Sequence, residues 1–316
     1  MTKIRDFCGN KRIFFTLSAI LLVISIASAF VFGVEVAIEF KGGTIISYSY
    51  TGEIDSTAVD QKAESVLGTP VTIQTGEAIG SDNLKSLTIS FSYEDGGFTP
   101  ELQDKLTASI SELCKENEIE VLESNDVSPS SGKEFFLKCL VAAIFAAVVL
   151  LIFIAFRFKK ISGWSAGLCA ILALFHDLII VFGAFNLLGY EINANFMAVI
   201  LTILGYSVND TIVIYDRIRE NQKSMPGSTT IAELINTSSS QSMRRSLRTS
   251  ITTVSAMIVV SVVAAVQGLD SILSFSVPMI FGMVSGTYSS LCIAPTVWVW
   301  LCEKRGKKTI KAVNKK

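Results

Sequence analysis

The stretch INANFMAVILTILGYSVNDTIVIY, residues 192–215, is long and apolar enough to cross a membrane, yet it contains one carboxylate, Asp210. A helix needs about 20 apolar residues to span the hydrocarbon of a bilayer. An ionisable side chain at that depth costs at least about 3 kcal/mol and usually marks an ion or proton path. The alternative is a polar contact that holds two helices together, although Ser or Asn would be enough for that. Asp210 is therefore the first candidate for a functional residue.

The composition also indicates a membrane protein. Of the 316 residues, 50% are hydrophobic and only 17% are charged, which is too apolar for a soluble domain of this size. Residues 161–190 form a second interrupted span, which contains His176 and Asp177. Four further stretches carry no charge, namely residues 13–34, 139–156, 249–269 and 271–302. The sequence therefore predicts six transmembrane helices, with one large hydrophilic segment between the first and the second.

The charges are strongly segregated along the chain. Residues 34–134 contain 19 acidic and 6 basic residues, whereas the rest of the chain is net positive. Basic residues flank the spans on one side, and the positive-inside rule makes that side cytoplasmic. Both termini then face the cytoplasm, and the acidic segment lies outside. The flanking basic groups are Lys3, Arg5, Lys11 and Arg12, then Arg157, Lys159 and Lys160, then those within residues 217–248, and then the tail after Cys302.

Two features could suggest a secreted protein. The first span has a basic start and an Ala27-Ser28-Ala29 triplet, as a cleavable signal peptide does. Its uncharged run is 22 residues long and continues past the triplet, so we expect the segment to remain as a helix. The six cysteines are divided among spans, cytoplasmic ends and the outer segment, so we predict no structural disulfide.

Residues 35–134 change to short alternating and amphipathic pieces, the pattern of a small water-soluble domain. The predicted strands are residues 44–51, 71–75, 86–93 and 119–122, and the predicted helices are residues 57–67 and the segment that follows Thr99-Pro100-Glu101. The order β-α-β-β-α-β predicts an extracytoplasmic α+β domain of split ferredoxin-like type on an α-helical polytopic membrane protein. It contains no His, no paired thiols and no Gly-rich phosphate loop, so we interpret it as a binding or docking module. Its acidity either forms a solvated surface, the commoner case, or attracts cationic ligands.

Around Asp210 the polar residues recur at helical spacing. Thr202, Tyr206, Asn209 and Val213 share a helix face with Asp210, and we expect this face to point into a bundle. Burial disfavours the charged form of a carboxylate and a nearby cation favours it, so a rearrangement of the partner can change its protonation near neutral pH.

The candidate cations are Arg245 and Arg248, which precede the fifth span. Arg245 shares a face with the polar or small residues Thr249, Thr252, Thr253 and Ala256. We therefore expect Arg245 at the cytoplasmic mouth of the bundle and Arg248 on a different side. An ordinary role as positive-inside anchors remains open for both.

Two further patterns lie in the spans. His176 and Asp177 are adjacent, so their side chains point about 100° apart and cannot both face the same partner. A proton relay and a satisfied pair between helices both remain open. Gly282 and Gly286 form a GxxxG pattern, which suits close packing of membrane helices. Small polar residues lie beside it at Ser285, Ser289 and Ser290.

Four ordered motifs resemble one known family. They are FKGG at residues 40–43, ALFHD at residues 173–177, GYSVNDTIVIYDRIREN at residues 205–221 and RSLRTSITT at residues 245–253. The chain resembles SecF, the smaller membrane subunit of the bacterial SecDF protein-export complex, over essentially its whole length. One departure is Glu39, which stands before Phe40 where the family usually has Asp.

The resemblance implies a proton-driven subunit related to the RND transporters. Asp210 would be the proton-responsive carboxylate and Arg245 the matching arginine, and we group Asn209 with them. Secondary candidates are His176, Asp177, Ser207 and Arg248, and the periplasmic motif comprises Phe40, Gly42 and Gly43.

The resemblance also implies partners and a location. A SecD-like subunit would supply the other half of the motor, and together they would help the SecYEG translocon and SecA to move unfolded chains outward at a late stage. The location would be the bacterial inner membrane. The implied organisation is a cytoplasmic start and first helix (residues 1–34), the periplasmic domain (35–134), a five-helix bundle (135–302) with a cytoplasmic loop (216–248), and a basic tail (303–316). We expect no enzymatic activity, no cofactor and no nucleic-acid partner.

Other classes of function remain as alternatives. An RND-type half-transporter for a lipid or small molecule would use the same carboxylate chemistry, although an outer domain of about 100 residues is small for a substrate cavity of that class. A passive assembly subunit would use Asp210 only as a helix clamp. An ATP-driven machine is disfavoured because no G-x-x-x-x-G-K-[ST] motif occurs.

Overall fold

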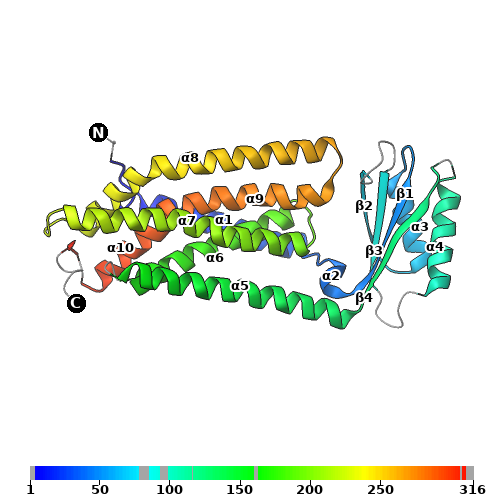
Figure 1. Cartoon of the computed structure of the whole chain (residues 1–316), viewed down its shortest axis with the longest axis horizontal. Coiled ribbons are helices and arrows are strands. Elements are labelled where there is room, and N and C mark those ends of the chain that lie inside the picture. Colours follow the sequence, from blue (N-terminus) through cyan, green and yellow to red (C-terminus); the bar gives the residue numbers. More distant parts are fainter. Residues whose placement is uncertain are drawn as a thin grey trace.

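The computed structural model describes residues 4–77, 85–92, 99–115, 117–159, 163–306 and 308–310. The molecule is elongated, with a bundle of long helices at one end and a four-stranded sheet with two helices at the other (Figure 1). Some residues named in the predictions fall outside the described ones: Lys3, Tyr93, Lys160, the first two residues of span 161–190, and residues 307 and 311–316 of the tail.

The sheet and its helices, called the sheet domain below, follow the predicted order along the chain. Its elements are β1 (Gly43–Tyr50), α3 (Ser56–Leu67), β2 (Val71–Glu77), β3 (Lys85–Phe91), α4 (Pro100–Leu113) and β4 (Glu120–Val127). The strands lie antiparallel in the spatial order β2-β3-β1-β4. Strand β4 extends further than predicted, because its exposed sequence EVLESNDV lacks an apolar alternation and forms a strand through its pairing with β1.

One face of this sheet forms the core of the sheet domain. Helices α3 and α4 cover it, and both begin at side-chain caps: Asp55 accepts from the N–H of Thr57 at 3.0 Å, and Thr99 accepts from the N–H of Leu102 at 3.4 Å. Such caps satisfy N–H groups that have no partner within the helix. The fully buried core residues are Ile46, Tyr48, Val59, Ala63, Leu87, Ile89, Leu106 and Ile110.

The chain has six helical segments, among the residues described, that are long and apolar enough to cross a membrane, as predicted. They are α1 (Lys11–Val31), α5 (Pro129–Arg157), α6 (Gly163–Leu187), α7 (Ala194–Ser224), α8 (Ile231–Val266) and a last segment that contains α9 (Asp270–Tyr288), a π-helical turn η2 (Ser289–Ile293) and α10 (Ala294–Lys304). A short helix α2 (Ile38–Lys41) connects α1 to the sheet domain.

The connection expected as a loop at residues 216–248 is mostly helical. Helix α7 continues to Ser224 and α8 starts at Ile231, so only residues 225–230 separate them. Ion pairs on the surface of α7, such as Arg219 with Asp216 at 2.9 Å, support this extension. Hydropathy identifies the apolar part of a helix and says little about where a charged, amphipathic continuation ends.

Small residues let the central helices approach closely. A side chain at Gly183 of α6 would overlap Ser25 of α1, and one at Gly286 of α9 would meet the Cβ of Ser207 on α7 at 3.0 Å. Helix α9 packs against α6, α7 and α8. The GxxxG pattern at Gly282 and Gly286 therefore lies at a helix crossing.

At the end of the bundle away from the sheet, both ends of the described chain dock on the extended helices (Figure 1). The N–H groups of Phe7 and Cys8 both donate to Asn236 Oδ1 of α8 at 3.0 Å. Near the other end, the N–H of Ile310 donates to the carbonyl of Thr229 at 3.1 Å.

Candidate functional site

Asp210 lies on α7 where it faces α8 and α9, and its side chain is nearly fully buried, with 4% exposed. The hydroxyls of Ser246 on α8 and Thr287 on α9 lie near its carboxylate. Among the described residues, Asp210 Oδ2 and Ser246 Oγ are both buried without a hydrogen bond. The bundle thus contains a carboxylate oxygen and a hydroxyl that are close to each other and unsatisfied.

The hydroxyl of Thr287 is engaged by other groups. It donates to the carbonyl of Met283 at 3.0 Å and lies 2.6 Å from Ser250 Oγ on α8. The hydroxyl of Thr287 is therefore shared among Met283, Ser250 and Asp210. The hydroxyl of Ser246 can donate to an ionised Asp210, whereas a protonated Asp210 can itself donate to the oxygen of Ser246 or Thr287.

Arg245 makes no ion pair with Asp210 within the part of the chain described, although its charge acts on Asp210 through space. The reason is geometric. Ser246 of α8 faces Asp210, and adjacent residues on a helix point about 100° apart, so Arg245 is directed to the exposed surface. Arg248 is exposed as well. The functional role of the Asp210 and Arg245 pair stays a prediction.

The predicted polar face of α7 is divided between two environments. Asp210 is buried, whereas Thr202 and Asn209 are exposed and Val213 is half-buried. Tyr206 is also half-buried, but its hydroxyl is buried without a hydrogen-bond partner in the described residues. Exposed polar groups on a membrane helix are costly against lipid, which makes this side of α7 a candidate for contact with another protein.

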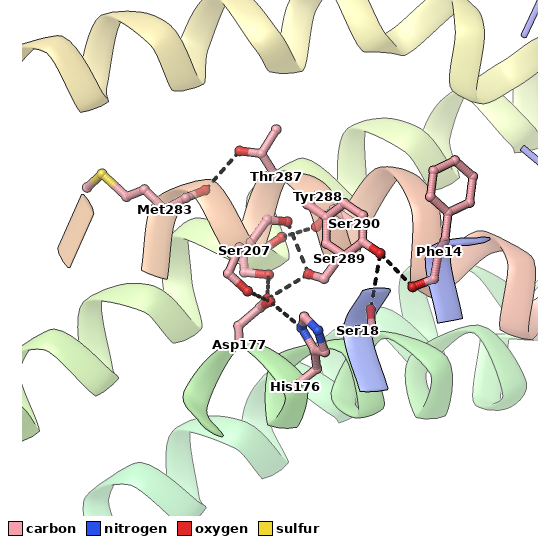
Figure 2. Close-up of polar contacts among 12 residues, drawn as sticks. Phe14, Ser18, His176, Asp177, Ser207, Met283, Thr287, Tyr288, Ser289 and Ser290 are labelled. Carbon is pink, nitrogen blue, oxygen red and sulfur yellow. Dashed lines mark hydrogen bonds and ion pairs between the residues drawn. The ribbon is translucent and has the colours of Figure 1, made fainter. Parts of the chain in front are cut away.

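A second carboxylate, Asp177 of α6, forms a larger network than its sequence context predicts. It is fully buried and accepts hydrogen bonds from three serine hydroxyls: Ser207 at 2.8 Å, and Ser285 and Ser289 at 2.7 Å each. Figure 2 shows Asp177 beside Ser207, Ser289 and His176. The donors come from α7, α9 and η2, so one carboxylate joins three elements.

His176 is both a partner of Asp177 and a contact to the last membrane segment. Its Nδ1 lies 3.1 Å from Asp177 Oδ1, and its ring lies 6.1 Å from the ring of Tyr288. The hydroxyl of Tyr288 in turn donates to the carbonyl of Phe14 at 2.7 Å (Figure 2). The two adjacent side chains therefore have different outside partners, as expected, and also contact each other. His176 Nε2 is buried without a hydrogen-bond partner in the part described.

The π-helical turn η2 lies beside both carboxylates. Ser289, its first residue, binds Asp177, and the hydroxyl of Ser290 donates to the carbonyl of Ser207 at 3.0 Å and lies 2.8 Å from Thr211 Oγ1 (Figure 2). Such wide turns occur mostly within longer helices and often at functional sites. Sequence reasoning noted these serines only as small residues and missed their bonds to Asp177 and α7. Their spacing on one helix face next to a buried carboxylate was the available signal.

The FKGG motif lies far from Asp210, at the junction between the bundle and the sheet domain. Phe40 is buried, and its ring centroid lies 5.5 Å from that of Phe135 and 5.3 Å from that of Phe136, both on α5. Gly42 has φ of +88°, and a side chain there would overlap the backbone of Pro129. The motif therefore allows two backbones to cross closely. The predicted site residues thus fall into two neighbouring groups in the bundle and one group at the junction.

Comparison with known proteins gives consistent results. A family model described as "Protein export membrane protein SecD/SecF, C-terminal" matches residues 107–304. The chain is 36% identical over 310 residues to the protein translocase subunit SecF of Petrotoga mobilis. The aligned region covers 97% of this chain and 99% of the relative. It is 32% identical over 290 residues to the SecF subunit of Calditerrivibrio nitroreducens, which covers 92% and 91% of the two chains.

Solved structures show the same relationship. The crystal structure of SecDF from Thermus thermophilus, described as a translocon-associated membrane protein, superposes with a TM-score of 0.77 at 28% identity. It covers 96% of this chain and 39% of the SecDF chain. A structure of SecDF in a super-membrane-facing form gives a TM-score of 0.66 at 27% identity. This chain therefore spans about two fifths of those longer proteins. Given the match to the family model and the near-full-length matches to SecF subunits, the chain belongs to the SecF family of protein-export membrane proteins.

Proposed function

We propose that this protein is the SecF subunit of a protein-translocation complex and that it couples the proton motive force to late steps of export. Its full-length relatives are named translocase subunits, which supports a role in transport rather than catalysis. One observation carries the proton-driven part of the proposal. Asp210 is buried among three membrane helices, with an oxygen that has no hydrogen bond in the described structure.

In this mechanism, protonation of Asp210 rearranges the contacts of α7 with α8 and α9. A neutral Asp210 can donate a hydrogen bond to the oxygens of Ser246 or Thr287, whereas an ionised Asp210 is favoured by the charge of Arg245. Each state therefore prefers a different packing of the same helices, which is the requirement for a two-state switch. Movement of one proton across 100 mV releases about 2.3 kcal/mol, enough to shift such an equilibrium substantially.

A SecD-like subunit is the proposed partner. This chain covers about two fifths of each solved SecDF chain. More than half of each of those chains therefore lies outside the part that this chain matches. In this chain, Thr202, Asn209 and Arg245 are exposed on helices that would otherwise face lipid. A partner helix would cover these polar groups and change the environment of the Asp210 site.

The remaining parts of the proposal concern location and organisation. The protein is proposed to lie in the bacterial inner membrane with both termini in the cytoplasm, so that the sheet domain lies in the periplasm. We assign the sheet domain to the split ferredoxin-like type, a proposal supported by its β-α-β-β-α-β order and its strand order β2-β3-β1-β4. The proposed working partners are the SecYEG translocon, SecA and the unfolded chains that they move.

The test is proton-driven export in membrane vesicles that contain this protein with its SecD-like partner and the translocon. Asp210→Asn keeps the size of the side chain but cannot exchange a proton, so export should lose its dependence on the proton motive force. Asp270→Asn is a matched control, because Asp270 is an exposed carboxylate at the start of α9. Unchanged proton-driven export in the Asp210→Asn variant would refute the mechanism and favour a role for Asp210 as a helix clamp.

A further inference from the structure

The start of α7 is held by the segment that connects α1 to the sheet domain. Val36 forms a parallel β-bridge with Ile192, two residues before α7. The N–H of Ile192 donates to the carbonyl of Glu35 at 2.8 Å, and the N–H of Ala37 donates to the carbonyl of Ile192 at 3.1 Å. This short bridge aligns the connecting segment with the end of α7.

Glu39 adds a side-chain contact to the same helix end. Its Oε2 accepts a hydrogen bond of 2.9 Å from the N–H of Ala194, the first residue of α7. The first N–H groups of a helix have no partner within the helix, and a carboxylate there also interacts favourably with the helix dipole. Asn193 caps a different N–H, that of Phe196, at 3.1 Å. Glu39 is thus a second cap, and it comes from another part of the chain.

The element that carries Glu39 is fixed to the sheet domain and to α5. Helix α2 continues through Gly42 directly into β1, and Phe40 packs on the aromatic rings of Phe135 and Phe136. At Gly132 of α5, a side chain would meet the backbone of Phe40 at 3.0 Å. A displacement of α2 therefore moves the first strand of the sheet with it.

Elsewhere the junction is open. A polar cavity of about 420 Å³ separates the sheet from the outer ends of α7 and α9. One side-chain bond crosses it near α7, from Thr72 Oγ1 of β2 to Glu191 Oε1 at 3.0 Å. The start of α7 is therefore connected to the sheet by these few bonds and by the buried cluster that Phe40 shares with Phe196 and Met197 of α7.

The other end of this connection is Asp210 itself. Helix α7 runs without interruption from Ala194 past Asp210, a distance of about 24 Å at 1.5 Å per residue. A shift or rotation of α7 that follows protonation would therefore reach Ala194 with little loss.

We propose that Glu39 is a positioning residue that couples α7 to the sheet domain, so that a movement of α7 at Asp210 is transmitted through the Glu39 to Ala194 hydrogen bond to α2 and β1. This inference rests on the proposed function of Asp210. Glu39 transmits the movement of α7, and it binds neither the proton nor the transported chain.

Glu39→Ala tests the coupling with two readouts in the same vesicles, the rate of proton-driven export and proton entry reported by a pH-sensitive dye. Loss of a helix cap should lower export by about fivefold or more, while proton entry through the bundle changes by less than about twofold. Glu39→Gln still offers an amide oxygen to the N–H of Ala194, so it should retain more than about half of the export rate. Glu35→Ala should match the wild type, since Glu35 contacts α7 through its carbonyl and its side chain is exposed.

A cross-link gives an independent test that does not depend on a destabilising variant. Cysteines at Val36 and Ile192, in a chain whose six native cysteines are replaced by serine, should form a disulfide on oxidation and leave export within about twofold of the reduced form. Arrest of export by the cross-link would overturn the inference, because it would mean that α2 and α7 must separate. Normal export in Glu39→Ala would also overturn the inference, and so would an equal loss of proton entry and export.

The two proposals can fail separately. If Asp210→Asn is inactive while Glu39→Ala is normal, the inference fails and the proposed function stands. If Asp210→Asn exports normally, the proposed function itself fails.

Discussion

Ser207 donates a hydrogen bond of 2.8 Å to Asp177 Oδ2 from a position one helical turn before Asp210. The two intramembrane carboxylates are therefore connected through a single turn of α7. One of them, Asp177, is surrounded by donors, and the other has an oxygen without one in the described structure. A fully bonded group suits a fixed point in a bundle, and an unsatisfied group suits a movable one.

Removal of this fixed point should destabilise the bundle. Asp177→Ala leaves three buried serine hydroxyls without their acceptor, so we expect a loss of about 2–4 kcal/mol and a lower apparent Tm for the purified protein in detergent. Asp177→Asn keeps one acceptor oxygen and should lose less. Equal thermal stability of Asp177→Ala and the wild type would show that the serine contacts contribute nothing.

Close packing of α1 on α6 is testable at Gly183. A Cβ atom there would overlap Ser25, so Gly183→Ala should cost about 1–3 kcal/mol. Gly205→Ala is the matched control, because no atom lies within 4 Å of the position that its Cβ would occupy. It should be neutral or slightly stabilising, as Ala is a better helix former than Gly. Thermal unfolding of the two variants in the same detergent gives the comparison, and an equal effect would argue against the α1 and α6 contact.

The backbone at the FKGG motif can be compared with that of an open left-handed glycine. Gly42 and Gly68 both have positive φ, +88° and +70°, but only Gly42 faces another backbone, that of Pro129. Gly68→Ala should pay about 1 kcal/mol, because Gly68, at φ +70° and ψ +10°, is in the left-handed conformation. Gly42, at φ +88° and ψ +152°, lies in a region that essentially only Gly adopts, so Gly42→Ala should lose a further 1–3 kcal/mol, roughly, from backbone strain and overlap together. Chemical or thermal unfolding measures the difference, and equal stability of the two variants would exclude the crossing as the reason for glycine at position 42.

Burial, with a smaller contribution from the nearby Asp6 carboxylate, raises the pKa of the Cys8 thiol to about 12. Only the thiolate reacts quickly with alkylating reagents. In a chain that keeps Cys8 as its only cysteine, labelling by iodoacetamide should therefore be slow at pH 8 and rise about tenfold per pH unit up to pH 10. A cysteine placed at the exposed Ser130 should react fast at pH 8 and level off near pH 9. Rapid labelling of Cys8 at pH 8 would show that the N-terminal segment is not docked on α8.

Much of the architecture was predictable because it depends on local patterns. Four uncharged runs and two interrupted apolar runs identified six membrane helices, and short alternating segments identified a separate unit of strands and helices. The charged continuations of α7 and α8 were not predicted, because their stability comes from ion pairs and from contacts between the two helices. Strand β4 extends past its prediction for a similar reason, as pairing with β1 supplies what its sequence lacks.

The candidate site was predictable in its residues and less so in its contacts. Asp210 is buried, as a charge in an apolar span suggests, but Arg245 does not touch it. Spacing along one helix gives the direction of a side chain relative to its neighbours, and it does not give the rotation of one helix against another. The bonds of Ser285 and Ser289 to Asp177 depend on that rotation. These bonds form because α6 and α9 pack side by side.

The continuity of α7 has a consequence for chain length. Asp210 is the sixteenth residue after Ala194 in one unbroken helix, so the angular phase between the two ends is set by the number of residues alone. Deletion of a single residue would turn Asp210 by about 100°, to the exposed position that Asn209 now holds. In the proposed coupling, the length of this interval therefore matters as much as the carboxylate at its end.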